Sequence, residues 1–420
     1  MYRIISTLII LLNALSVQSM IITGKVTNGI NGIEGVTVAI QNSDNSVQTN
    51  SNGEYELTEV APLLLLNNTT QKSLLAKTTH SITITASKDG YVSEIKVVPP
   101  STTKLDFVLI KEGEETWVAS LRPRDKSSSR RIAWTTSDGE NSEITYLTDS
   151  EHNDYKPVIS PNGKKIAFFR VTNGMDDVAE NDVTLWKSKI CVMNVDGTGF
   201  KELTNDDYFD CNLHWTRDGS NMISWTRIIN EPGTPNTHTW MGICWTSQDA
   251  SPGDEVVLSD QPFEFGYSFL RDGRKLLRRH PSLYYLMTPN PEGSPSYERI
   301  EYMHDNMYLH KMTISQDETK ISYIRLTEEE LNATGEYMAG IICHADFDAS
   351  IPKISNEIEI TAYDINSISW YSSYSKDDSK IIYAHNGTIR MYDITSGNTT
   401  QISTEPAIEY RYPNYISSVK

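Results

Sequence analysis

The sequence lacks the features of a membrane-spanning or nucleic-acid-binding protein. Beyond residue 19 no segment approaches the roughly 20 apolar residues that a spanning helix needs, and the apolar run at 63–66 is only four residues long. Positive charge is scarce, because 37 Lys and Arg stand against 55 Asp and Glu, a formal net charge of −18. Such an acidic surface repels phosphate backbones, which argues against nucleic acid as the main partner.

Familiar catalytic motifs are missing as well. The 420 residues contain no Gly-x-Ser-x-Gly nucleophile motif, no phosphate-binding glycine loop and no zinc motif. Their absence argues against serine-hydrolase and nucleotide chemistry. The composition, with 38% hydrophobic and 22% charged residues, excludes a disordered, collagen-like or coiled-coil chain, and the length allows two or three domains.

The first 19 residues have the pattern of a secretory signal. Arg3 provides a positive start, residues 4–17 are mostly apolar, and small residues up to Ser19 offer a cleavage site. We therefore expect an exported protein, located in a periplasm, at a cell surface or in the medium. An uncleaved membrane anchor is the alternative.

Residues 20–112 alternate apolar and polar side chains with a period of two, as in Ile22, Gly24 and Val26. Asn-Gly and Asp-Gly pairs separate the alternating runs, which is typical of tight turns. The pattern predicts a sandwich of about seven short strands, interrupted over residues 61–80. Residues 23–26, 33–38, 49–55 and 86–91 resemble the carboxypeptidase regulatory-like domain, a transthyretin-like sandwich, and this resemblance implies no catalytic role.

A different repeat runs through residues 113–420. A strand, turn and strand motif, clearest at residues 160–166, recurs from Thr216, Leu270, Ser315 and Ser375, at spacings of 56, 54, 45 and 60 residues. Each copy places an Asp or Asn turn between two strands. Because Glu318 and Asp378 replace the expected glycine in the last two copies, we expect those two turns to be built differently.

Counting strands predicts how this region closes. Five four-stranded units span residues 155–404, three strands precede them, and one strand, expected over 412–419, follows. The simplest solution is a six-bladed β-propeller whose last blade joins both ends of the domain, so that no open edge remains. The turn motif and a recurring Leu-Thr strand ending resemble the TolB-like propeller family. The predicted fold class is therefore all-β, with an N-terminal transthyretin- or Ig-like β-sandwich (20–112) and a TolB-like propeller (113–420).

The repeat also predicts that the cysteines are unpaired. Cys191, Cys244 and Cys343 fall at nearly the same place in the third strands of three blades. Equivalent positions on neighbouring blades should be of order 15 Å apart, whereas a disulfide requires Cα atoms within about 7 Å. We expect these side chains to be buried as small apolar groups, while Cys211 has no obvious partner.

Candidate binding residues come from six loops that surround one mouth of the propeller channel. Each loop leads from the outer strand of one blade to the inner strand of the next. Aromatic side chains flanked by carboxylates suit a peptide segment, a basic tail or a carbohydrate, although solvated loops with ordinary aromatic packing have the same composition. The predicted contact residues, called the mouth residues below, are His152, Asp154, Tyr155, Asp207, Tyr208, Asp210, Phe265, Asp305, His310, Trp370, Glu409, Tyr410 and Arg411.

A metal site is the alternative for these loops, because His152, His304 and His310 lie in them and imidazole suits divalent transition metals. The TolB-like family includes a carbohydrate-lyase branch, similar to oligogalacturonate lyases, that has histidines and a divalent metal at the channel. Its ligand pattern does not map onto this sequence, since the histidines occupy only two of the six loops. His214 is expected to pack near the channel instead. The acidic run from Asp176 to Asp182 lacks the spacing of an EF-hand calcium loop.

These observations favour an exported, non-enzymatic binding protein that needs no cofactor. Its channel mouth is expected to engage a protein or glycan partner. The alternative is a metal-assisted polyuronate lyase or another carbohydrate-active propeller enzyme, for which a divalent metal would be the cofactor.

Overall fold

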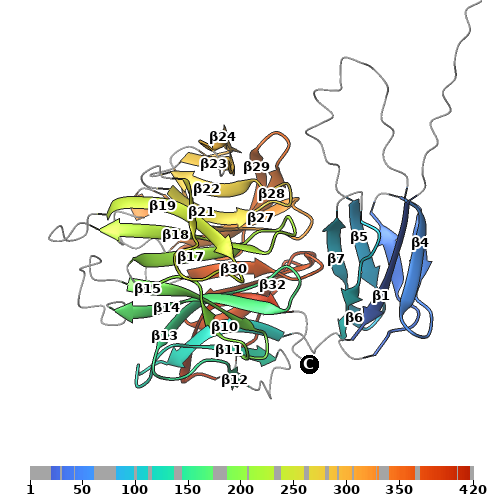
Figure 1. Cartoon of the computed structure of the whole chain (residues 1–420), viewed down its shortest axis with the longest axis horizontal. Helices are drawn as coiled ribbons and strands as arrows, with labels where there is room; N and C mark the ends of the chain where they lie inside the picture. Colours follow the sequence, from blue (N-terminus) through green and yellow to red (C-terminus); the bar gives the residue numbers. More distant parts are fainter. Residues whose placement is uncertain are drawn as a thin grey trace, which may run out of the picture.

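The computed structural model is built of strands that form nine sheets (Figure 1). It describes residues 20–28, 31–41, 43–60, 82–98, 102–111, 116–136, 144–173, 187–205, 208–230, 238–259, 264–279, 283–290, 293–304, 307–327, 329–330, 340–364, 369–403 and 405–416. The predicted signal at 1–19, the interruption at 61–80 and the acidic run from Asp176 to Asp182 lie outside these residues. Within the described part of the chain, no helix has the length and apolarity needed to cross a membrane.

The first nine strands form the predicted sandwich. Two sheets, in the orders β4-β1-β8 and β3-β2-β5-β7, share an apolar core that contains Ile22, Val38, Ile84 and Phe107, while β6 and β9 pair as a short ribbon. The period-two alternation places these residues on the inward faces. The strands are β1 (Met20–Thr27), β2 (Thr37–Ile40), β3 (Ser46–Gln48), β4 (Glu54–Val60), β5 (Ile82–Ser87), β6 (Tyr91–Val92), β7 (Glu94–Val98), β8 (Phe107–Val108) and β9 (Ile110–Lys111).

The remaining strands form six sheets, which are the six predicted blades. From the inner strand outward, blade 1 is β13–β16, blade 2 is β17–β20, blade 3 is β21–β24, blade 4 is β26–β29, and blade 5 is β30–β33. Blade 4 has an additional parallel strand, β25, at its outer edge. The bounds in blades 1 to 3 are β13 (Asn153–Ile159), β14 (Lys165–Asn173), β15 (Lys187–Asn194), β16 (Lys201–Glu202), β17 (Phe209–Trp215), β18 (Met222–Asn230), β19 (His238–Ser247), β20 (Val256–Ser259), β21 (Glu264–Phe269), β22 (Lys275–Arg279), β23 (Leu283–Thr288) and β24 (Ser296–Arg299).

Blade 6 closes the ring as the strand count predicts. Its inner strand is the last strand of the chain, which pairs antiparallel with β10, from Pro123↔Ile408 to Thr116↔Ile416. This closing strand was expected over 412–419 but begins at Ile408. The other bounds are β25 (Glu301–Tyr302), β26 (Met307–Ile314), β27 (Lys320–Thr327), β28 (Ile341–Asp348), β29 (Lys353–Glu359), β30 (Ser369–Tyr374), β31 (Lys380–His385), β32 (Thr388–Asp393), β33 (Thr399–Gln401), β34 (Ile408–Ile416), β10 (Thr116–Pro123), β11 (Arg131–Thr136) and β12 (Ile144–Tyr146).

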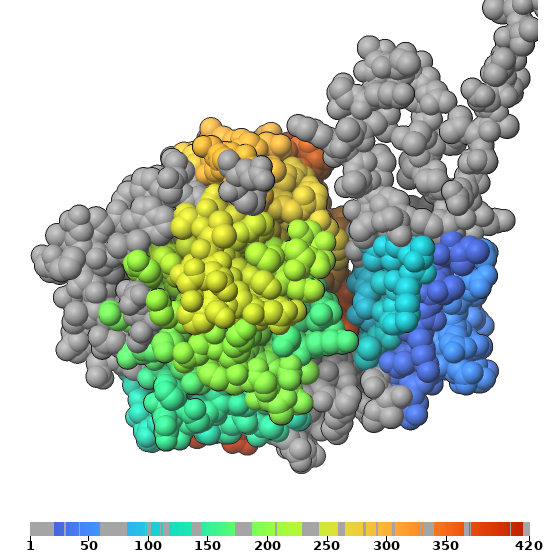
Figure 2. Space-filling model, in the orientation of Figure 1, coloured from blue at the N-terminus to red at the C-terminus, as the bar shows by residue number. Residues whose placement is uncertain are grey.

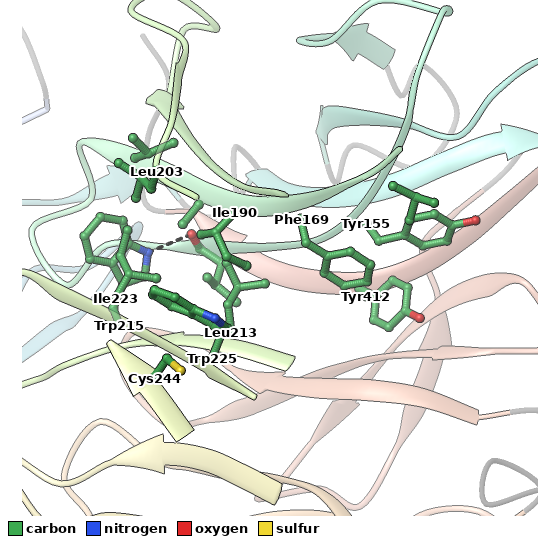
Figure 3. Packing of buried hydrophobic residues seen from close by; sticks show 14 of the residues in the cluster. Tyr155, Phe169, Ile190, Leu203, Leu213, Trp215, Ile223, Trp225, Cys244 and Tyr412 are labelled. Carbon is green, nitrogen blue, oxygen red and sulfur yellow. Dashed lines mark hydrogen bonds between the residues drawn. The ribbon is translucent and has the colours of Figure 1, made fainter. Parts of the chain in front are cut away.

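Apolar side chains fill the spaces between neighbouring blades. In the cluster between blades 1 and 2, Trp225 is fully buried and Trp215 donates its indole N–H to the carbonyl of Val158 at 3.0 Å (Figure 3). All four cysteines are free, and Cys191, Cys244 and Cys343 are buried, which confirms the prediction drawn from the repeat. Burial raises the pKa of Cys244 to about 12, so this thiol behaves as a packing residue.

The prediction that the turns of blades 4 and 5 are built differently is wrong. Glu318 and Asp378 have φ values of 64° and 56°, in the same left-handed region as Gly163, Gly219 and Gly273. A side chain in this region costs roughly 1–2 kcal/mol. Contacts offset this cost, because Glu318 Oε1 accepts from the Arg271 backbone N–H at 2.8 Å.

Asp378 has a similar role one blade further on. Its two carboxylate oxygens accept from the backbone N–H groups of Gln316 and Asp317, at 2.6 and 2.8 Å. The turns of blades 3, 4 and 5 are therefore joined to one another by the two residues that depart from the repeat.

We expect the stability of the protein to fall between about pH 4 and pH 7, in part because of Asp378. Burial raises the pKa of Asp378 to about 7, against the opposing effect of its backbone hydrogen bonds. The folded state thus favours the protonated form, and that stabilisation is lost as the pH rises from the unfolded pKa of about 4 through 7. Over this interval the free energy of unfolding should fall less in Asp378→Asn than in the wild type. The two decreases should differ by at most about 4 kcal/mol.

The measurement is urea unfolding at several pH values. Asp89→Asn, at an exposed position in the sandwich, is the control and should keep the wild-type pH dependence. Identical slopes for wild type and Asp378→Asn would show that the carboxyl group does not titrate in this interval.

Candidate functional site

Every inner strand of the propeller has an irregularity at the same height. The register between the first and second strands shifts in all six blades, as expected for β-bulges. Four residues at these bulges have positive φ: Lys156 at 49°, Asn212 at 56°, Lys311 at 56° and Tyr412 at 55°. Bulges redirect side chains, and here they bring residues of different blades together in the channel.

Five side chains at the bulges form a hydrogen-bonded and stacked layer across the channel, called the crossbar below: Lys156, Asn212, Lys311, Tyr371 and Tyr412. The hydroxyl of Tyr371 in blade 5 donates to Asn212 Oδ1 in blade 2, on the opposite side of the ring. Lys156 Nζ of blade 1 donates to the same oxygen at 2.7 Å. Lys311 Nζ of blade 4 donates to the Tyr371 hydroxyl at 3.0 Å.

The other two blades complete the crossbar. The Asn212 amide N–H donates to the carbonyl of Gly266 in blade 3, and the Tyr412 ring of blade 6 lies 5.1 Å from the Tyr371 ring. Lys156 Nζ lies 4.1 Å from the centre of the Tyr371 ring, a cation–π contact. Five blades contribute a side chain and blade 3 contributes a carbonyl, so the crossbar spans the channel.

The crossbar is rich in cations. Lys156 is 3% exposed, and its Nζ lies 3.2 Å from His214 Nε2. Burial, together with nearby lysines, lowers the pKa values of Lys156 and His214 far below their usual ranges, and burial lowers that of Lys311 to about 8. Lys275 is fully buried next to this layer and donates to the carbonyl of Tyr267 at 2.9 Å.

A cavity of about 560 Å³ lies between the crossbar and the sandwich. Lys156, His214 and Tyr371 line its inner end, and residues of β7 line the end formed by the sandwich. Figure 1 shows β7 on the side of the sandwich that faces the propeller, and Figure 2 shows the two parts in contact. Polar and aromatic groups thus surround a concave site that both parts of the chain build.

An ion pair and a backbone hydrogen bond attach the sandwich to blade 5 next to this cavity. Lys376, in the inner turn of blade 5, donates its ammonium to Glu94 Oε1 at 2.8 Å, and its carbonyl accepts from the Ile95 N–H at 3.4 Å. Burial alone would raise the pKa of Glu94, but Lys376 and Lys96 hold it below its usual value. Glu94 is therefore a paired anion at the outer wall of the cavity.

Arg217 and Arg271, in the turns of blades 2 and 3, also line the cavity, and both form polar contacts with blade 4. Arg217 donates to the carbonyl of Ser315 at 2.9 Å, and Arg271 lies 3.3 Å from Glu318 Oε1. These contacts tie the turns of blades 2 and 3 to blade 4, so the two guanidinium groups have a structural role.

The structure places several mouth residues inside the protein. Asp154 and Asp210 are 0% exposed and form bidentate pairs with Arg170 and Arg227, with N···O distances of 2.8 to 2.9 Å. Both arginines come from the second strand of the same blade. The carboxylates expected to attract a basic partner are therefore already neutralised, and a recurring arginine in the second strands was the sequence signal for this pairing. Tyr155, His310 and Tyr410 are also buried.

The other mouth residues differ in their surroundings. His152, Tyr208, Phe265, Glu409 and Arg411 are half-buried, and Tyr208 lies under the Arg227 guanidinium at 4.4 Å. Asp207, Asp305 and the side chain of Trp370 lie outside the described residues. The contact surface predicted at this mouth stays a prediction.

Comparison with known proteins identifies the fold. No family model matches the chain, and no curated protein matches it. Among solved structures, TolB from Acinetobacter baumannii is 14% identical, with a TM-score of 0.53, over 80% of this chain and 79% of that one. The hydrazine synthase of Kuenenia stuttgartiensis is 14% identical, with a TM-score of 0.52, over 72% of this chain and 47% of that one. The chain contains a six-bladed β-propeller whose fold is similar to that of TolB. At these identities the similarity shows the fold alone, and the resemblance of residues 20–112 to the carboxypeptidase regulatory-like domain stays a prediction.

The TolB-like propeller does not bring the three candidate metal-binding histidines together. His152 Nδ1 lies 2.9 Å from Asp149 Oδ1, and His304 Nε2 lies 3.7 Å from Glu357 Oε1. His310 instead contacts Arg278. Over the described ranges, no three His, Cys, Asp or Glu side chains are grouped so that they could hold a metal ion. His214 lies at the channel as expected, beside Lys156.

Proposed function

We propose that the protein is an exported, non-enzymatic binding protein, and that the propeller channel holds part of a protein or glycan partner. The cavity of about 560 Å³ between the crossbar and the sandwich supports this proposal. Its volume lies in the range of ligand sites, and its lining combines aromatic rings with a few convergent polar groups, which is typical of such sites. Export rests on the pattern of residues 1–19.

The binding role is favoured over the lyase role by the arrangement of the histidines. A metal-assisted polyuronate lyase would need His152, His304 and His310 close to one metal, whereas each has a separate partner. The cavity lies on the opposite side of the crossbar from the mouth residues. We therefore assign the ligand to the cavity and keep the mouth as the second candidate surface.

Two variants, one in the cavity and one at the mouth, test this proposal. The full chain is screened on an array of neutral and acidic glycans and on a library of displayed peptides, and the retained probe is titrated against two variants. Ile95→Trp narrows the cavity from the sandwich side, and Tyr208→Ala removes an aromatic ring at the mouth. We expect Ile95→Trp to weaken binding at least tenfold and Tyr208→Ala to leave it unchanged.

Other results would contradict the proposal in distinct ways. A loss with Tyr208→Ala alone would move the site to the mouth. Turnover of an oligouronide by the wild-type protein would establish an enzyme. Retention of no glycan and no peptide would count against a binding role. Thermal unfolding of both variants shows whether a loss of binding is a loss of fold.

A further inference from the structure

Three buried lysines that no acid compensates lie at or behind the inner end of the cavity, where Lys156 is part of the lining. Lys156, Lys275 and Lys311 each contact only neutral groups: an amide and an imidazole, a carbonyl, and a phenol. Among the described residues, no Asp or Glu forms an ion pair with any of the three. Burying an ammonium group without a counter-charge is costly, since the charge loses its hydration.

Elsewhere several buried or half-buried cations of the chain pair with carboxylates. Arg170 pairs with Asp154, Arg227 with Asp210, and Arg325 with Glu357. Even within the cavity, Lys376 pairs with Glu94. Lys156, Lys275 and Lys311 have no such partner among the described residues, although the net charge of the protein is −18. A site that lacks its own counter-charge is suited to receive one from a ligand.

The donors at this end of the cavity point to the same chemistry. An ammonium group has three N–H donors, and Lys156 uses one toward Asn212 and one toward His214, which leaves one for a ligand within the described surroundings. If neutral His214 accepts at Nε2, its Nδ1 carries a proton and is a second donor. Lys156, His214 and Tyr371 all line the cavity.

We propose that the inner end of the cavity is an oxyanion-binding site, in which Lys156 and His214 hold a carboxylate, phosphate or sulfate group of the ligand. This inference rests on the proposed function, because it assigns the chemistry of a ligand bound in the same cavity. The oxyanion replaces the missing counter-charge, and charge-assisted hydrogen bonds to it are stronger than neutral ones. Glu94 does not oppose it, since Lys376 neutralises that carboxylate at the outer wall.

Binding of an anion should be linked to proton uptake. The titratable groups that influence Lys156 or lie beside it are Cys211, His214, Lys275, Lys311, Tyr371 and Tyr412. None of these supplies a negative charge at neutral pH. An oxyanion favours the charged ammonium, so its binding returns a proton to the site and its affinity increases as the pH falls.

Isothermal titration calorimetry of the full chain tests the site with small probes: sodium sulfate, inorganic phosphate, sodium glucuronate and, as the neutral match for glucuronate, glucose. We expect the anions to bind and glucose not to bind. The anion affinities should fall at least tenfold in Lys156→Met and in His214→Leu. Lys25→Met, which removes one exposed charge from the sandwich, should bind like wild type. Titrations in two buffers of different ionisation enthalpy should show net proton uptake.

The relative affinities identify the source of the oxyanion. Tighter binding of glucuronate than of sulfate or phosphate assigns an acidic sugar or another carboxylate, and the reverse order assigns a phosphate or sulfate ester. Equal anion binding by wild type and both folded cavity variants, or binding without proton uptake, would overturn the oxyanion site. If Ile95→Trp still weakens a glycan or peptide while no anion binds, the proposed function stands and only this inference fails.

Discussion

Replacing Glu409 by Gln is expected to lower the free energy of unfolding by about 3–5 kcal/mol, the usual cost of removing one partner from a buried ion pair. Glu409 lies in the closing strand β34, and its Oε2 accepts from Arg122 Nε at 2.7 Å and Arg130 Nη2 at 2.8 Å. The Arg130 side chain is 0% exposed. A glutamine leaves this buried guanidinium without its counter-charge at the point where both ends of the propeller meet.

Urea unfolding followed by tryptophan fluorescence measures this effect. Glu405→Gln, an exposed position just before β34, is the matched control and should unfold like wild type. Equal unfolding midpoints for Glu409→Gln and wild type would mean that the ion cluster does not contribute to ring closure.

The difference in unfolding free energy between Glu409→Gln and the wild type should shrink in acid. Burial alone would raise the pKa of Glu409, but Arg130, Arg411 and Arg122 lower it to about 2. Because the folded-state value is lowered, the stabilisation is present above the unfolded pKa of about 4.3 and is lost as the pH falls through 2. The unfolding free energies of wild type and Glu409→Gln should therefore converge as the solution is acidified.

Asp210→Asn should also destabilise the protein, with a loss of about 3 kcal/mol of unfolding free energy. Asp210 is fully buried and accepts two hydrogen bonds from the Arg227 guanidinium, each of 2.8 Å. Asparagine preserves the shape but removes the charge and one acceptor. Because Arg227 keeps its contact with Glu255 at 3.0 Å, the expected loss lies at the lower end of the range for buried pairs.

Denaturant unfolding again provides the measurement, with Asp249→Asn at an exposed position as the control. If Asp210→Asn instead kept wild-type stability and changed only the binding of a partner, Asp210 would be a contact residue at the mouth, as the sequence suggested, and its pairing with Arg227 would be of minor energetic importance.

Periodic features of this fold could be predicted from the sequence. The turn motif recurs because each of blades 1 to 5 needs the same hairpin between its inner and second strands, so the five copies count these blades. The sharing of the last blade follows from strand number alone. The buried, unpaired state of Cys191, Cys244 and Cys343 follows from their equivalent positions in separate blades.

Features that depend on contacts between blades could not be predicted. Glu318 and Asp378 keep the left-handed turn because neighbouring blades supply N–H groups to their carboxylates, and those groups come from residues distant in the sequence. Likewise, the loop positions of Asp154 and Asp210 were predicted, but their burial depends on arginines in the adjacent strand.

The crossbar was missed for a related reason. It is assembled by bulges, which shift the alternation by one residue within strands too short to reveal it, so nothing in the sequence distinguishes Lys156 or Lys311 from an exposed lysine. Of the residues named at the inner end of the cavity, only His214 was expected near the channel.

The crossbar also determines how a ligand can enter and leave the propeller channel. Because the hydrogen bonds of Tyr371 and Lys156 to Asn212 span the lumen, a ligand in the cavity cannot pass through the propeller channel to the other face. A ligand bound in the cavity must leave by the route through which it entered. That route passes the sandwich, which the Glu94–Lys376 ion pair holds against blade 5. The residence time of a bound ligand is thereby tied to the strength of these contacts between the sandwich and blade 5.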